Sequence, residues 1–157
     1  MTPPTGIRSD GALIFAREYA HPIDRVWQFL SEPDLCGLWF GSWEGKALPG
    51  VTVPFTMTAE EEGPPVDLRV HICDGPHLLA VEMGEADKPW RLSAELEGAG
   101  HATTITMRHQ MDPESYNSAY GPGWEYYLDR LGAALDDAPM PAWDRYEPEM
   151  LAYYEAL

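Results

Sequence analysis

The sequence is poor in basic residues, and this limits what the protein can bind. Lysine and arginine number 10 against 26 aspartates and glutamates, which gives a formal net charge of −16. Nucleic-acid binding depends on neutralising phosphates with Lys and Arg, so this balance argues against a nucleic-acid-binding function. It equally disfavours docking on anionic membrane surfaces. The acidic charge itself is explained by solubility.

Cysteine and long apolar runs are also scarce. The two cysteines, Cys36 and Cys73, form one pair at most and stand beside apolar residues, which favours a cytosolic protein with buried thiols over a disulfide scaffold. The first residues contain no apolar signal segment, and no run of about 18 apolar residues occurs anywhere in the chain. We therefore expect a cytoplasmic protein that makes no membrane contact.

Motifs for metal binding and catalysis are absent from the sequence. His71, His77 and His101 are scattered over predicted turns and strand faces, and neither CxxC nor HxxxH spacing occurs. There is no GxSxG nucleophile motif and no glycine-rich phosphate loop. We predict no metal, no cofactor and no catalytic residue.

One long amphipathic helix stands out near the C-terminus, from Pro122 to Leu135. Its polar residues Glu125, Asp129 and Arg130 fall opposite an apolar stripe, which is typical of a helix lying on a broad apolar partner. Proline suits the start of such a helix, where its missing N–H has no partner to lose. The stripe consists of Trp124, Leu128, Leu131 and Leu135.

The rest of the 157 residues predict a single domain with a substantial core, built on an antiparallel sheet. A first strand at 13–20 is followed by two short helices, from Pro22 to Leu30 and from Asp34 to Trp39. Alternating apolar and polar residues then indicate five strands joined by turns. Pro54 suggests an edge position or a bulge, and the acidic turn at 60–65 suggests a solvated loop. The five strands are expected at 51–59, 66–73, 79–83, 90–96 and 103–109.

The chain ends in an aromatic tail. After a proline-rich joint, residues 143–157 include Trp143, Tyr146, Tyr153 and Tyr154, and such a segment is expected to be covered rather than solvated. It could pack on the outer face of the sheet, close a cavity mouth as a lid, or exchange onto a twin subunit and form a homodimer.

The order of these elements and three short motifs resemble a known superfamily. Strand, two short helices, meander and long helix is the order of the helix-grip fold. The segments REYAHPIDRVW at 17–27, SEPD at 31–34 and LWF at 38–40 resemble the opening of SRPBCC (START-like, Bet v 1-like) proteins. They are most similar to the branch related to the activator of the heat-shock protein 90 ATPase, as are GW at 123–124 and YLDRL at 127–131.

The resemblance covers about residues 10–136 and implies an α+β helix-grip fold. A curved antiparallel sheet would wrap around the long C-terminal helix, with two short helices after the first strand and a cavity between sheet and helix. This divides the chain into an N-terminal extension at 1–10, a START-like domain at 11–136 and a C-terminal tail at 137–157. Members of the superfamily bind lipids, hormones or polyketide intermediates, or act as chaperone partners.

Eight residues are predicted to line a ligand-binding cavity, because large apolar side chains with inward parity gather where helix-on-sheet folds hold ligands. The alternative is that the aromatic residues form a plain core. For His109 the alternatives are a satisfied core histidine, a polar anchor or an acid–base group. The predicted set is Trp39, Phe40, Phe55, Trp90, Met107, His109, Trp124 and Tyr127.

Three functions compete at this stage. The first is a binding module that holds a small hydrophobic or amphipathic ligand between the sheet and the long helix. The second is an interaction protein that acts as a chaperone partner, in the manner of the heat-shock protein 90 ATPase activators. The third is a polyketide cyclase-like enzyme that uses His109 or Tyr127, although the missing motifs make an enzyme the less favoured interpretation.

Overall fold

A computed structural model describes residues 2–59 and 63–157, so part of the predicted acidic turn at 60–65 lies outside the described residues. The strands form one eight-stranded sheet in the order β1-β2-β8-β7-β6-β5-β4-β3. Every pair in it is antiparallel. The strands are β1 (Ile7–Ser9), β2 (Ala12–Tyr19), β3 (Gly41–Trp43), β4 (Thr52–Met57), β5 (Val66–Asp74), β6 (Leu78–Met83), β7 (Trp90–Ala99) and β8 (Ala102–Gln110).

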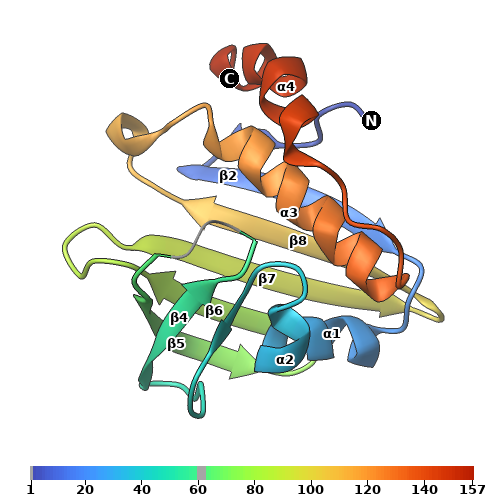
Figure 1. The fold of residues 1–157 in the computed structure, drawn as a ribbon. Helices are drawn as coiled ribbons and strands as arrows, with labels where there is room; N and C mark the ends of the chain where they lie inside the picture. Colours follow the sequence, from blue (N-terminus) through green and yellow to red (C-terminus); the bar gives the residue numbers. More distant parts are fainter. Residues whose placement is uncertain (1, 60–62) are drawn as a thin grey trace.

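The helices confirm the predicted α+β helix-grip fold. Helix α3 (Tyr120–Leu135) crosses one face of the curved sheet (Figure 1). Helices α1 (Ile23–Ser31) and α2 (Pro33–Cys36), which follow β2 and precede β3 in the chain, lie at one end of the sheet. A short 3-10 turn, η1 (Pro113–Ser115), precedes α3, and a second one, η2 (Trp143–Arg145), precedes the last helix, α4 (Tyr146–Glu155).

The core lies between α3 and the inner face of the sheet. The predicted apolar stripe of α3 is buried against inward side chains of β2 and β8, such as Phe15 and Ile105. Helix α3 begins at Tyr120, two residues before the predicted start, and Pro122 lies in the first turn, where N–H groups have no intrahelical partner. The buried stripe residues are Trp124, Leu128, Leu131 and Leu135.

The C-terminal tail packs on α3 and not on the outer face of the sheet, so the first of the three placements considered from the sequence is wrong. Its helix α4 buries Tyr146, Met150 and Tyr154, and α4 and the N-terminus lie on the same side of the molecule (Figure 1). The tail thereby covers Glu125, which was expected on a polar face but has no exposed surface.

Glu125 is compensated by a dense set of partners. Its carboxylate accepts hydrogen bonds from the backbone N–H of Thr5 at 2.6 Å and from the Tyr154 hydroxyl, and it forms an ion pair with Arg17. A buried carboxylate is tolerated only when it is paired and hydrogen-bonded in this way. The cluster therefore ties both chain ends and β2 to α3.

Two local details of the sheet bear on the site. Strand β4 lies between β5 and β3 and is not an edge strand, but β3 ends at Trp43, opposite Phe55, so Pro54 has no strand neighbour on that side. The register of β5 shifts between Val70 and Ile72, and this bulge reverses the side-chain alternation after it. The bulge turns Ile72 outward and Cys73 towards the inner face, yet Cys73 lies at the end of the strand and is still exposed. The expectation that both thiols are buried is therefore wrong, since only Cys36 is buried.

Candidate functional site

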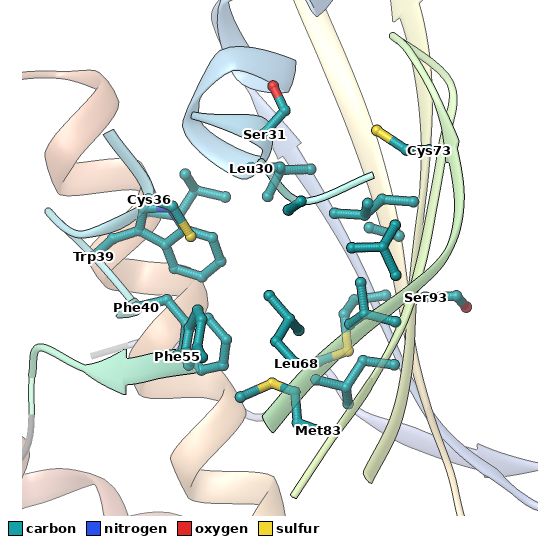
Figure 2. Close-up of a pocket in the computed structure, with 18 of the residues that line it drawn as sticks. Leu30, Ser31, Cys36, Trp39, Phe40, Phe55, Leu68, Cys73, Met83 and Ser93 are labelled. Carbon is teal, nitrogen blue, oxygen red and sulfur yellow. The ribbon is translucent and has the colours of Figure 1, made fainter. Parts of the chain in front are cut away.

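A cavity of about 120 Å³, here called the sheet–helix cavity, lies between the inner face of β4–β8, the α1–α2 segment and α3 (Figure 2). Its walls are apolar because the inward parity of each strand carries Leu, Val, Met or Phe. The lining residues are Leu30, Ser31, Cys36, Trp39, Phe40, Trp43, Ala47, Phe55, Leu68, Val70, Cys73, Leu79, Val81, Met83, Leu92, Ser93, Ala94, Ile105, Met107, Trp124, Leu128 and Leu131.

The few polar groups in these walls are turned away or already paired. The Ser93 hydroxyl points away from the cavity, and the Ser31 hydroxyl lies at its edge and donates to the Trp27 carbonyl at 2.9 Å (Figure 2). The Trp39 indole N–H donates to the Phe29 carbonyl at 2.8 Å. Burial raises the pKa of the Cys36 thiol to about 12, so this thiol stays neutral. The described lining thus offers an apolar ligand contact surface and no charged group.

Ser31 of α1 and Cys73 of β5 lie at the same end of the cavity lining, and Cys73 is exposed to solvent there (Figure 2). The bulge in β5 turns Cys73 into the lining, whereas Ile72 is exposed at 43%. Partial burial, and then the neighbouring Asp74 carboxylate, raise the pKa of the Cys73 thiol. This end of the cavity, here called the cavity mouth because its lining residue Cys73 is exposed, was missed from the sequence, because plain alternation along 66–73 points Ile72 inward.

The structure brings five of the eight predicted site residues together around the sheet–helix cavity. Tyr127 is buried but does not line the cavity, and its ring makes a T-shaped contact with Phe40 at a centroid distance of 5.1 Å. Trp90 and His109 share the inward face but do not line this cavity. The five lining residues are Trp39, Phe40, Phe55, Met107 and Trp124.

Trp90 and His109 instead line a separate surface cleft of about 560 Å³, here called the aromatic cleft. The cleft lies between the start of β7, the end of β8, η1 and the first residue of α3, Tyr120. His109 is buried, and its Nδ1 accepts a hydrogen bond from the Trp124 indole at 3.1 Å. Burial lowers the pKa of His109 to about 4, so the imidazole is neutral at physiological pH.

Trp124 therefore belongs to both sites. Its ring lines the sheet–helix cavity, and its indole N–H donates a hydrogen bond to His109 of the aromatic cleft.

Among the described residues, no cluster of His, Cys, Asp or Glu could hold a metal ion. Nor does the described part of the chain contain a helix long and apolar enough to cross a membrane.

Comparison with known proteins agrees with this architecture. Residues 20–136, the greater part of the chain, match the family described as Activator of Hsp90 ATPase homolog 1-like protein. Among curated proteins, none matches the chain in sequence.

Several solved structures share the fold. The crystal structure of CalU16 from Micromonospora echinospora is 24% identical, with a TM-score of 0.75, and the match covers 93% of this chain and 87% of that one. A protein from Bordetella parapertussis is 23% identical, with a TM-score of 0.75 and coverage of 99% and 94%. DynU16, a protein of the dynemicin biosynthetic locus, is 20% identical, with a TM-score of 0.71 and coverage of 85% and 51%.

Proposed function

The chain belongs to the Activator of Hsp90 ATPase homolog 1-like family, and we propose that it binds a small hydrophobic or amphipathic molecule in the sheet–helix cavity. The observation that carries this proposal is an apolar cavity inside the core whose lining includes one solvent-exposed residue, Cys73, at one end. Natural cores are packed with few voids larger than a water molecule, so an apolar space in the core that a solvent-exposed residue borders is a natural place for a small ligand.

The polarity of the cavity defines the chemical class of the ligand. A polar group carried into the interior would lose its hydrogen bonds to water and find no partner there, at a cost of several kcal/mol. Polar atoms of the ligand would therefore stay at the cavity mouth, beside Ser31 and Cys73. An alcohol or acid with an alkyl or aryl tail meets both conditions.

The size of the cavity limits the buried part of the ligand. An apolar cavity of about 150 Å³ is known to hold benzene. At about 120 Å³, the sheet–helix cavity takes a short alkyl chain or a single ring without rearrangement. A longer ligand would extend through the cavity mouth.

The two other functions raised by the sequence have less support. A cyclase-like enzyme needs an acid–base group at its substrate, and the described lining of the sheet–helix cavity contains no carboxylate or imidazole. A chaperone partner needs a docking surface; the acidic charge of −16 would suit a basic partner, but solubility explains that charge already.

The proposal is tested by the thermal unfolding of the protein with added 1-octanol. A ligand that binds only the folded state raises the unfolding temperature by mass action, so wild type should show a rise that increases with octanol concentration. Ala94→Phe fills the cavity from β7 and should abolish this rise. Glu95→Phe, one residue away on the same strand at an exposed position outside the cavity lining, is the matched control and should keep it.

The contrary result is equally clear. If octanol raises the unfolding temperature of Ala94→Phe as much as that of wild type, the alcohol binds elsewhere and the cavity is not the site. If it raises neither, and the protein co-purifies with a chaperone, the interaction function replaces the binding function.

A further inference from the structure

We propose that the aromatic cleft is a second ligand site, distinct from the sheet–helix cavity, and that it takes an uncharged planar aromatic molecule carrying a hydrogen-bond acceptor. The proposal rests on the cleft's own geometry and does not require the sheet–helix cavity to be occupied. Its volume of about 560 Å³ falls in the range of small-molecule sites.

Aromatic rings form the walls of the cleft. The Trp90 and Tyr120 rings are 5.0 Å apart between centroids and inclined at 68°, so they form two sides of a corner. The His109 ring closes the corner, at 4.7 Å from Trp90 and 5.2 Å from Tyr120. Trp90 remains 38% exposed, although its position at the start of β7 gives it the inward parity of buried Leu92. A flat aromatic ligand would cover this exposed indole face by stacking.

His109 places one hydrogen-bond donor at the base of the corner. Because Nδ1 accepts from Trp124, the neutral ring carries its proton on Nε2. No hydrogen bond of Nε2 occurs within residues 2–59 and 63–157, and yet no buried side-chain nitrogen or oxygen there lacks a partner. The Nε2–H group therefore belongs to the small exposed part of His109 and reaches the cleft. A ligand that fills the cleft would take water away from this donor, so a ligand that supplies an acceptor is favoured over one that leaves the donor unpaired.

The charges around the cleft favour an uncharged ligand. Lys88 and Arg91 lie on its rim together with the carboxylates of Asp87, Asp112 and Glu114, so neither sign dominates. The net charge of −16 opposes the approach of anionic molecules. An aromatic heterocycle or aryl ketone meets all three conditions.

Quinoline and naphthalene test the proposal, because they have the same shape and only quinoline carries an acceptor. At neutral pH, each is titrated into ¹⁵N-labelled protein while the indole N–H signals of Trp90 and Trp124 are followed. Quinoline should shift both signals and bind about tenfold more tightly than naphthalene at this site, although it is the less hydrophobic of the two.

Variants localise the effect. Trp90→Ala should weaken quinoline binding about tenfold, by removing the stacking face. His109→Asn keeps an acceptor near the Nδ1 position but loses the Nε2 donor, so it should weaken quinoline binding similarly. His109→Gln keeps a donor near the Nε2 position and should bind quinoline about as tightly as wild type. Ala94→Phe fills only the sheet–helix cavity and should leave quinoline binding unchanged, so failure at one site is distinguishable from failure at the other.

Three results would overturn the proposal. The first is naphthalene shifting the Trp90 signal with an affinity equal to that of quinoline. The second is quinoline binding that Trp90→Ala leaves intact. The third is no shift of the Trp90 signal at millimolar quinoline. Each can be obtained without the His109 variants, so the test stands even if those variants fold poorly.

Discussion

The indole N–H of Trp124 donates to Nδ1 of His109 across 3.1 Å, and this bond joins the first turns of α3 to the end of β8. It lies at the boundary between the two cavities, because Trp124 lines one of them and His109 the other. The bond also fixes the neutral tautomer of the imidazole. The first prediction follows from that neutral state.

Acid should destabilise the protein through His109. Its pKa is about 4 in the folded state and 6.5 in its unperturbed state, so between these values the unfolded chain binds the proton more tightly. The contribution of His109 to the free energy of unfolding is therefore fully present above pH 6.5 and is lost as the pH falls towards 4. The loss amounts to about 3 kcal/mol, from about 1.4 kcal/mol per pH unit.

Urea unfolding over this pH range measures the effect against the background of titrating carboxylates. His109→Gln removes the titrating group, so the free energy of unfolding should fall less between pH 6.5 and pH 4 in this variant than in wild type. His101→Gln, at an exposed histidine in the turn between β7 and β8, is the matched control and should follow wild type. Parallel profiles for wild type and His109→Gln would refute the role of His109.

Two glycines in the first turns of α3 should respond in opposite ways to the same substitution. A Cβ on Gly121 would meet the ring of buried Tyr154 at 2.2 Å, whereas a Cβ on Gly123 would meet nothing within 4 Å. Alanine is the better helix former by up to about 1 kcal/mol, so Gly123→Ala should stabilise the protein by several tenths. Gly121→Ala should destabilise it, because Tyr154 and α4 must move off α3.

Chemical denaturation compares the free energies of unfolding of the two variants. If both are stabilised alike, the tail does not pack closely on α3. If Gly121→Ala destabilises wild type but does not further destabilise a Tyr154→Ala variant, the clash with Tyr154 is the cause.

Cys73 should be the reactive thiol of the folded protein. Cys73 is exposed at the cavity mouth, whereas Cys36 is buried with a pKa raised to about 12. A disulfide reagent should therefore modify one thiol quickly in the native state and the second only on unfolding, since the thiolate is the reactive form. Cys73→Ser should remove the fast reaction.

Ligand in the sheet–helix cavity should protect this thiol. Saturating 1-octanol places its polar end beside Cys73 and should slow the native-state reaction severalfold, which absorbance of the released chromophore records. An unchanged rate at saturation would mean that the polar end does not lie at the predicted mouth.

Local sequence pattern was enough to predict the layers of the fold and much of the cavity wall. Alternation along β6 puts Leu79, Val81 and Met83 on one parity, and all three line the sheet–helix cavity. The stripe of α3 does the same for Trp124 and Leu128. In both cases a residue's face depends only on the period of its own element.

Features that depend on distant parts of the chain could not be predicted in this way. The alternation of side chains places Trp90 and His109 on the correct face of the sheet. It does not show that both residues lie beyond the end of the sheet–helix cavity, in the aromatic cleft. The bulge that exposes Ile72 has no signal of its own in the sequence. Glu125 resembles a solvated residue until α4, whose sequence has no helical apolar stripe, covers it.

The most direct test of the ligand-binding account is calorimetric titration of the protein with straight-chain 1-alkanols of increasing length. While each added methylene enters the sheet–helix cavity, the binding free energy should improve by about 0.8 kcal/mol, and it should stop improving once the chain reaches the cavity mouth. Ala94→Phe should shorten the range over which chain length matters. Affinities that are independent of chain length, or identical in wild type and Ala94→Phe, would contradict the account.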